Sequence, residues 1–253
     1  MIVEDPRPYR EEASPLLLVH GFLGEPADWD AVIADLTMHR RVLRANLLLH
    51  SAAQPDLQAL SEALALAIER ASVVPVSVVG YSLGGRVTMT LAASRPELLR
   101  RAIAISSTPG LEDGVERAAR AGADEALAVA LEQQGLSAFI ERWYAQPLFA
   151  SLRDHPDFGL VARRREAGDA AAWANILRNA SPGSNPSLWD RLEGMSAGLS
   201  MAVGALDGKY LAIAHEVARR APHVRVDVIE GAGHAAHLER PEAVAALVDS
   251  LLP

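Results

Sequence analysis

The feature that most constrains this chain is a short apolar run that leads directly into a glycine–serine–glycine pattern. Residues 73–79 are mostly β-branched and end at Gly80, which is typical of a buried strand. The pattern Gly80-Tyr81-Ser82-Leu83-Gly84 follows at once, and residues 83–94 then have the apolar spacing of a helix. A strand–turn–helix junction of this kind holds its serine in a sharp, strained turn, with glycines where side chains would clash. We therefore predict that Ser82 is the centre of the chemistry; an ordinary glycine-rich turn is the alternative.

Apolar runs of strand length alternate with segments of helical spacing along much of the chain. The strand-like runs are 16–19, 41–49, 102–105, 199–203 and 224–229. The helix-like segments are 59–71, 211–220 and 241–252, and the last begins at a proline, which suits a helix start. Strands that alternate with helices predict an α/β fold with a mostly parallel, doubly wound sheet.

This alternation stops in the middle of the chain. No convincing strand lies between about Thr108 and Leu192, and this stretch holds three of the four tryptophans. Helical periodicity is present at 118–131, 136–144 and 169–179. We therefore predict a core formed by residues 1–107 and 193–253, with residues 108–192 inserted as a helical cap.

Two polar residues stand behind later strands in positions that suit a serine-based site. A serine hydroxyl needs a hydrogen-bonded base, and the base needs a carboxylate that orients it. Asp207 follows the run 199–203 and His234 follows the run 224–229, so both are expected on loops at the carboxyl ends of strands. Asp227 and Asp190 are the alternative acids, but Asp227 lies inside a predicted strand and Asp190 inside the cap. We predict a catalytic triad of Ser82, His234 and Asp207.

The first apolar run ends in a second glycine-containing segment, His20-Gly21-Phe22-Leu23-Gly24. We predict that it forms an oxyanion hole, in which the backbone N–H of Phe22 joins the backbone N–H of Leu83, the residue after the serine. The alternative is an ordinary turn at the end of a strand.

Composition narrows the function classes. The 253 residues carry a net charge of −8, which argues against a general nucleic-acid binder, and the absence of cysteine excludes thiol catalysis and thiolate metal sites. The N-terminal residues do not form a secretory signal, and the apolar runs are too short to span a bilayer, so we expect a cytoplasmic protein without a membrane partner. No dinucleotide or phosphate-loop pattern is present, and His234 and His237 lack a third ligand, so neither a cofactor nor a metal is expected.

The chain resembles one branch of the α/β hydrolases in the segments HGFLG, GYSLGGR, TPGLEDGVERAAR, WYAQPLFASL, NPSLW and GAGHAAH. This branch consists of the 2-succinyl-6-hydroxy-2,4-cyclohexadiene-1-carboxylate synthases of menaquinone biosynthesis. The resemblance, which runs from about Leu16 to Pro253, implies an α/β-hydrolase fold with an inserted helical cap. It also implies a cofactor-free lyase that expels pyruvate, with Ser82 acting as the base rather than as an acyl-forming nucleophile.

The resemblance further implies a small substrate that carries several carboxylates. The implied substrate-binding residues are Tyr81, Arg86, Arg120, Trp143, Arg164 and Lys209. Arginine presents a planar fork that matches a carboxylate, although an arginine in a cap is also commonly a solvated surface residue. Within residues 163–165, Arg163 or Arg165 is an alternative to Arg164. The chain departs from many such hydrolases at residues 46–51, where NLLLHS replaces an Asp-Leu-Pro-Gly-His-Gly-like turn near the predicted site.

Two other functions remain open at this point. A carboxylesterase or related hydrolase would use the same triad through an acyl-enzyme, but an enzyme for neutral esters has little use for the arginines. A catalytically silent binding protein of the same fold would have no reason to keep an intact triad. We expect a monomer or a small homo-oligomer.

Overall fold

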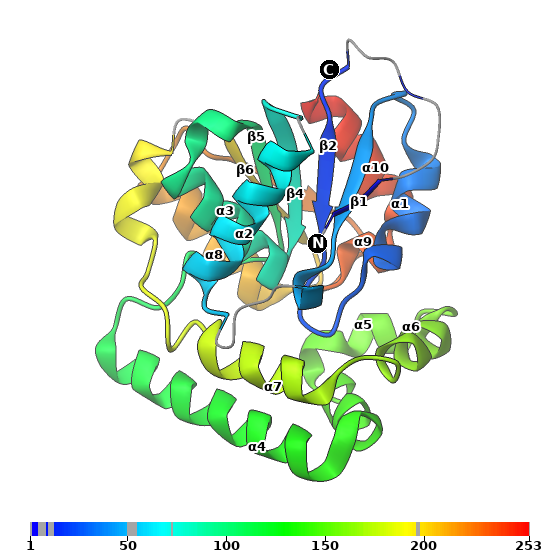
Figure 1. Ribbon diagram of the computed structural model, residues 1–253, viewed down its shortest axis with the longest axis vertical. Helices are drawn as coiled ribbons and strands as arrows, with labels where there is room; N and C mark the ends of the chain where they lie inside the picture. Colours follow the sequence, from blue (N-terminus) through cyan, green and yellow to red (C-terminus); the bar gives the residue numbers. More distant parts are fainter. Residues whose placement is uncertain are drawn as a thin grey trace.

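A computed structural model describes residues 2–4, 9, 13–49, 55–71, 73–195 and 198–252. The fold is built on a seven-stranded sheet with the strand order β1-β3-β2-β4-β5-β6-β7 (Figure 1). Strand β1 runs antiparallel to β3, and every other neighbouring pair is parallel. The predicted mostly parallel, doubly wound sheet is thus confirmed.

The strands are β1 (Ile2–Glu4), β2 (Leu16–Val19), β3 (Val42–Ala45), β4 (Val76–Tyr81), β5 (Leu99–Ile105), β6 (Leu199–Gly204) and β7 (Arg225–Ile229). Every strand except β1 contains or overlaps a predicted apolar run; β1 was not predicted, and β5 begins three residues before the run 102–105. Strands β2, β4 and β6 are buried along their whole length, as expected of strands covered on both faces. The run 41–49 is the one that divides, because β3 ends at Ala45 and a 3-10 turn, η2 (Leu47–Leu49), follows it.

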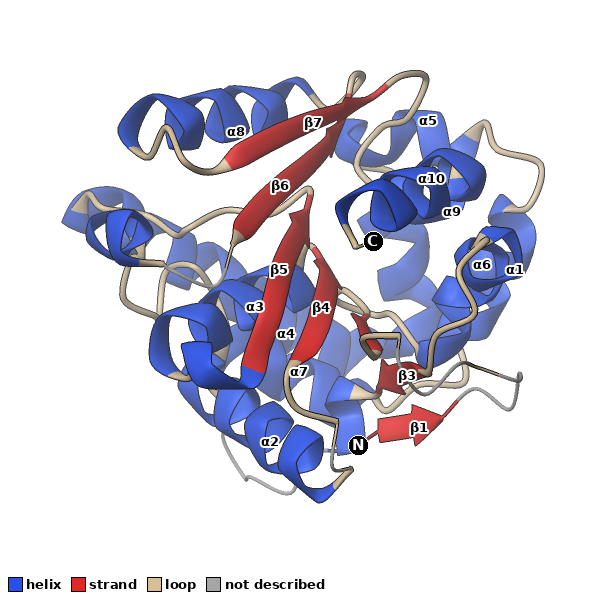
Figure 2. Cartoon of the chain, turned by 90° about the horizontal axis from the view of Figure 1, so that it is seen from above, coloured by secondary structure: helices blue, strands red, loops and turns tan. Residues whose placement is uncertain are grey.

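Helices cover both faces of the sheet, as Figure 2 shows from above. Helices α2 (Leu57–Arg70), α3 (Leu83–Ser94) and α8 (Gly208–Arg220) lie on one face. Helices α1 (Asp30–Asp35), α9 (Ala236–Glu239) and α10 (Pro241–Leu251) lie on the other. The sequence did not predict α1 or α9, since four to six residues are too few to show a helical period. Short 3-10 turns occur at η1 (Pro26–Trp29) and η3 (Pro96–Leu98).

Among the residues that the structure describes, the segment between β5 and β6 contains helices and loops but no strand. It comprises α4 (Gly114–Tyr144), η4 (Pro147–Phe149), α5 (Ala150–Arg153), α6 (Phe158–Arg165), α7 (Ala170–Asn179) and η5 (Trp189–Gly194). Gly135, at φ 78°, interrupts α4 and so separates the two predicted helical stretches 118–131 and 136–144. Helices α4 to α7 lie together below the end of the sheet to which β2 and β4 point (Figure 1). The exact limits of the cap, 108 and 192, stay a prediction.

A helix that crosses a bilayer needs about 20 predominantly apolar residues. None of the described helices is both long and apolar enough to cross a membrane.

Candidate active site

Ser82 lies on a strained turn between β4 and α3. Its backbone has φ 49° and ψ −107°, a conformation that an L-residue adopts only when its surroundings impose it. The Ser82 N–H donates to the carbonyl of Ile105 at 2.9 Å, and its carbonyl accepts from Ser107 Oγ at 2.9 Å. A side chain at Gly80 would place its Cβ 2.2 Å from the Gly84 carbonyl oxygen, so the pattern needs glycine there. The turn thus presents the serine hydroxyl at the carboxyl end of β4.

His234 connects Ser82 and Asp207 in one chain of hydrogen bonds. Its Nε2 lies 3.2 Å from Ser82 Oγ, and its Nδ1 lies 2.7 Å from Asp207 Oδ2. The loops after β6 and β7 are tied together by the N–H of Leu206, which donates to the carbonyl of Ala232 at 2.9 Å. The structure therefore brings together the three residues predicted as a triad. Of the alternative acids, Asp227 lies in β7 and accepts from Arg225, and Asp190 lies in η5.

The loop after β2 and the start of α3 each provide one backbone donor beside the serine, from Phe22 and Leu83. Leu23 has φ 60°, and the N–H of Gly24 closes the turn onto the carbonyl of Gly21 at 3.1 Å. Among the described residues, the amides of Phe22 and Leu83 have no hydrogen-bond partner, and both residues line the pocket around Ser82. Two free N–H groups of this kind are what an oxyanion requires.

The buried ring of His20 connects this loop to the segment after β3. Its Nε2 accepts from the N–H of Leu47 at 3.1 Å, and its Nδ1 lies 2.8 Å from the carbonyl of Gly21. Complete burial lowers the pKa of His20, so the ring stays neutral and both contacts persist. Leu47 belongs to the unusual segment 46–51; Asn46 to Leu49 lie within the described residues, whereas His50 and Ser51 lie outside them.

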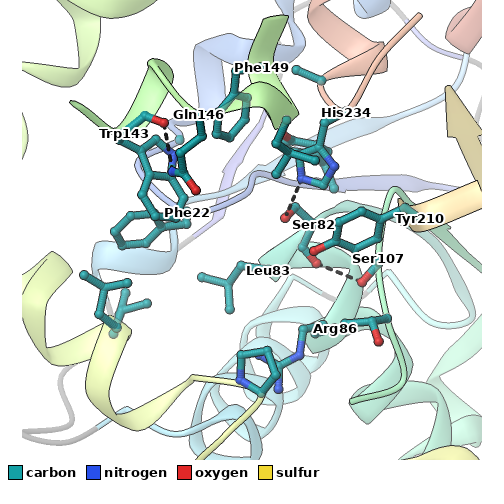
Figure 3. A pocket seen from close by; sticks show the side chains of 18 of the residues that line it. Phe22, Ser82, Leu83, Arg86, Ser107, Trp143, Gln146, Phe149, Tyr210 and His234 are labelled. Carbon is teal, nitrogen blue, oxygen red and sulfur yellow. Dashed lines mark hydrogen bonds between the residues drawn. The ribbon is translucent and has the colours of Figure 1, made fainter. Parts of the chain in front are cut away.

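The triad opens into a cavity of about 180 Å³ between the core and the cap. Figure 3 shows Ser82 and His234 on one side of the cavity, and Phe22 and Trp143 close together on the opposite side. Phe22 and Trp143 pack with ring centroids 4.9 Å apart, and Phe149 packs edge-on to His234 at 5.7 Å. One part of the wall is therefore aromatic and supplied mainly by the cap.

Another part of the wall is cationic. Arg86, Arg120 and Lys209 all line the cavity, and they come from three different helices. Burial lowers the pKa of Arg86 to about 9, and burial together with Arg120 lowers the pKa of Lys209. Arg120 is paired with the carboxylate of Asp124 at 2.7 Å, whereas no ion pair is seen for Arg86 or Lys209 among the described residues. Burial of these two cations is costly, and an anionic ligand would reduce that cost. Among the described residues no group of three or more side chains could hold a metal ion.

Comparison with known proteins identifies the family. The family model described as "Alpha/beta hydrolase family" matches residues 16–247. A putative 2-succinyl-6-hydroxy-2,4-cyclohexadiene-1-carboxylate synthase of Bacillus subtilis is 30% identical over 99% of this chain and 93% of its own. The synthase of that name from Enterobacter sp. is 33% identical over 94% of this chain and 91% of its own. The chain belongs to the α/β-hydrolase family, in its 2-succinyl-6-hydroxy-2,4-cyclohexadiene-1-carboxylate synthase branch.

Other relatives are longer or more distant. The chain is 32% identical to the chloroplastic protein PHYLLO of Arabidopsis thaliana over 91% of this chain, but it spans only 15% of that protein's length. The solved structure of MenH from S. aureus matches with a TM-score of 0.91 at 23% identity, over 99% of this chain and 97% of that one. A thermophilic esterase from Thermogutta terrifontis matches with a TM-score of 0.83 at 20% identity, over 99% and 92%. These two structures support the α/β-hydrolase fold.

One residue expected from the resemblance to the synthase branch lies elsewhere. Arg164 is absent from the described lining of the pocket and lies 3.6 Å from the carboxylate of Glu25. Its neighbour Arg165 lines the pocket instead, with its guanidinium 2.7 Å from Asp28. Successive residues on a helix point about 100° apart, so the orientation in which α6 packs on the core decides which arginine faces inward. The other implied positions, Tyr81, Arg86, Arg120, Trp143 and Lys209, all lie in the pocket wall of this synthase-branch chain.

Sequence reasoning missed several groups that support the site. Glu239 accepts from the backbone N–H groups on both sides of His234, Gly233 at 2.7 Å and Ala235 at 3.1 Å. Tyr210 packs on the His234 ring at 4.6 Å, and burial raises the pKa of its hydroxyl. Asp124 accepts from Arg120 at 2.7 Å inside the cap. A signal existed only for Tyr210, which follows Asp207 by three residues at the first turn of α8.

Proposed function

We propose that the chain catalyses one step of menaquinone biosynthesis, the elimination of pyruvate from 2-succinyl-5-enolpyruvyl-6-hydroxy-3-cyclohexene-1-carboxylate. The product is 2-succinyl-6-hydroxy-2,4-cyclohexadiene-1-carboxylate. One observation carries the proposal: the hydrogen-bonded chain Ser82–His234–Asp207 opens onto a pocket whose wall includes Arg86, Arg120 and Lys209. The names of two relatives that align over almost the whole chain support the same reaction.

The bond changes follow from the names of the two compounds. The ring double bond between carbons 3 and 4 is replaced by double bonds between carbons 2 and 3 and between carbons 4 and 5. This change requires loss of the proton on carbon 2, a shift of the double bond and departure of the enolpyruvyl oxygen from carbon 5. The departing enolate takes up one proton to become pyruvate, so protons and electrons balance without a cofactor.

The triad supplies the base for the first step. As Ser82 Oγ removes the proton from carbon 2, its own proton passes to His234 Nε2, 3.2 Å away. Asp207 orients the ring through Nδ1 and stabilises the imidazolium that forms. His234 then returns a proton to the departing enolate. Because carbon 2 is adjacent to the succinyl carbonyl, negative charge develops on that oxygen, where the amides of Phe22 and Leu83 stabilise it.

The cationic wall accounts for binding. The substrate carries carboxylates on its ring, its succinyl arm and its enolpyruvyl group, and the pocket offers the guanidiniums of Arg86 and Arg120 and the ammonium of Lys209. Guanidinium–carboxylate contacts are strong where water is excluded. Tyr81 and Trp143 contribute shape, since both line the cavity and neither carries a charge.

The alternative function is that of a carboxylesterase. The same triad and oxyanion donors would form an acyl-enzyme, and the fold is shared with the esterase from Thermogutta terrifontis. Three pocket cations without a full set of counter-charges favour the lyase, because a neutral ester gains nothing from them.

A pyruvate-release assay decides between these activities. The purified chain is mixed with the enolpyruvyl cyclohexene carboxylate, and a neutral p-nitrophenyl ester is run alongside. We expect release of pyruvate that Ser82→Ala abolishes, whereas Ser94→Ala, a matched change at the far end of α3, retains it. Ester cleavage without release of pyruvate would identify a hydrolase and refute the lyase.

A further inference from the structure

A buried ion pair joins the oxyanion loop to the cap. Asp28 Oδ1 and Arg165 Nη1 are 2.7 Å apart, and the two side chains are 2% and 3% exposed. Asp28 lies in η1, directly after the loop that carries Phe22, and Arg165 is the last residue of α6. The pair therefore links the core and the cap across 137 residues of sequence.

The carboxylate of Asp28 also organises the loop itself. Its second oxygen, Oδ2, accepts from the backbone N–H of Glu25 at 3.0 Å. The loop wraps so closely around this oxygen that a Cβ on Gly24 would lie 2.9 Å from it. One side chain thus serves both the turn beside Phe22 and the contact with the cap.

On the cap side, Arg165 contacts the last turn of α4, which is also the turn that packs on the oxyanion loop. Arg165 Nε donates to the hydroxyl of Tyr144 at 3.2 Å. The preceding residue, Trp143, packs against Phe22, as Figure 3 shows. The loop is therefore held against the cap by an aromatic contact at Phe22 and by an ionic contact at Asp28.

Both partners are charged at neutral pH. Burial alone would raise the pKa of Asp28, but Arg165 brings that pKa below its ordinary value. Burial alone would lower the pKa of Arg165, but Tyr144 and Asp28 bring it above its ordinary value. Removing either partner would leave a buried, unpaired charge, which is far more disruptive than losing an exposed pair. The pair between Arg164 and Glu25 joins the same two segments, but it is only half-buried and its atoms are 3.6 Å apart, so its loss is expected to cost less.

We infer that Asp28 and Arg165 are positioning residues, which hold the Phe22 amide in register with Ser82 only when the cap is docked. Arg165 accordingly supports the oxyanion loop through Asp28 and does not bind a substrate carboxylate. The inference deepens the proposed function, because it assigns a role to the arginine that faces the pocket in place of Arg164.

The test uses the reaction of Ser82 with an alkyl fluorophosphonate. Ser82 Oγ attacks phosphorus, fluoride leaves and the serine proton passes to His234, while the phosphoryl oxygen occupies the oxyanion hole. The rate constant and the final labelled fraction are followed by intact mass. This readout does not involve pyruvate. Failure of the proposed lyase reaction can therefore be distinguished from failure of the inferred positioning role of Asp28 and Arg165.

We expect Arg165→Met and Asp28→Asn each to lower the phosphonylation rate constant at least tenfold, while the final labelled fraction stays complete. The double variant should react no more slowly than the slower of the two single variants. Arg165→Lys should recover part of the rate. Arg163→Met is the matched control, since Arg163 lies on the same helix with an exposed side chain, and it should stay within twofold of the wild type. In the pyruvate assay, both positioning variants should lower kcat more than they raise KM.

Two results would overturn the inference. One is an unchanged rate constant in the folded variants, with only the labelled fraction reduced, which is the signature of a purely structural pair. The other is a normal phosphonylation rate with a raised KM in Arg165→Met alone, which would make Arg165 an anion ligand. If the charge variants do not fold, Tyr144→Phe serves in their place, because it removes only the hydroxyl that Arg165 contacts. A phosphonylation rate constant three- to tenfold lower supports the positioning role, and an unchanged rate constant refutes it.

Discussion

His234 Nδ1 lies 2.7 Å from Asp207 Oδ2, and each of these residues is only 3% exposed. A carboxylate in this position requires the proton on Nδ1, which leaves Nε2 as an acceptor toward Ser82. The carboxylate of Glu239 adds to this control, because it accepts from the backbone N–H groups on both sides of the histidine and so holds the loop that carries the ring. The tautomer of His234 is therefore set before any substrate binds.

Asp207→Asn tests the tautomer directly. The amide is isosteric with the carboxylate, but its NH₂ group can donate to Nδ1 and so favours the tautomer in which Nε2 carries the proton. We expect kcat for pyruvate release to fall by roughly 10³–10⁴-fold, with the melting temperature changed by only a few degrees. A fall of less than tenfold in a folded variant would show that Asp207 does not orient the base.

Gly204→Ala tests the close approach of the acid and histidine loops. A Cβ at Gly204 would lie 2.2 Å from the carbonyl oxygen of Gly233, and backbone of this kind cannot move aside as a side chain can. We expect the free energy of unfolding in urea to fall by about 2–3 kcal/mol, because the loop must shift. Gly122→Ala is the control: it lies within α4 with no atom near the new methyl group, and it should raise stability by roughly 0.5–1 kcal/mol. Equal effects at the two sites would contradict the packing argument.

Arg86→Ala and Arg164→Ala separate the pocket wall from the cap surface. Arg86 lines the pocket and is buried, whereas Arg164 lies outside the described lining. Losing a charge-assisted contact costs about 1.5–3 kcal/mol, so KM for the anionic substrate should rise roughly 10- to 100-fold in Arg86→Ala. The rise in Arg164→Ala should be at least five times smaller, and KM for a neutral ester should change little in either variant. The reverse order would restore Arg164 as the substrate contact.

His237 makes the stability of the protein sensitive to acid. It is fully buried between Trp29 and Tyr81, with ring centroids 4.7 and 4.3 Å away, and burial lowers its pKa from 6.5 to about 3. Between these two pH values the unfolded chain binds more protons than the folded chain. Stability is therefore present above pH 6.5 and is lost as the pH falls through this window.

His237→Leu should remove this dependence. Between pH 7 and pH 5, the free energy of unfolding should fall by about 2 kcal/mol less in this variant than in the wild type. Urea unfolding at the two pH values measures the difference, and His223→Leu, at an exposed histidine, is the control that should behave like the wild type. A variant as acid-sensitive as the wild type would exclude His237 as the source.

The sequence by itself determined those features that depend on neighbouring residues. Helix α3 spans residues 83–94 as predicted, and Ser82 lies at its start, because strand, glycine turn and helix all belong to one continuous pattern. Asp207 and His234 could be placed for the same reason: each follows an apolar strand, and the carboxyl ends of parallel strands meet at one edge of a sheet. A parallel sheet was predictable because buried strands need unbroken apolar runs.

Only the tertiary structure decided which side chains from distant segments meet. Arg164 and Arg165 are adjacent and chemically identical, and the angle at which α6 packs on the core selects Arg165 for the interior. The pairing of Arg165 with Asp28, and of Glu239 with the amides around His234, leaves no periodic mark in the sequence. Such contacts depend on the relative placement of whole elements, which is set by packing of the entire core, whereas a strand or a turn is specified by the residues within it.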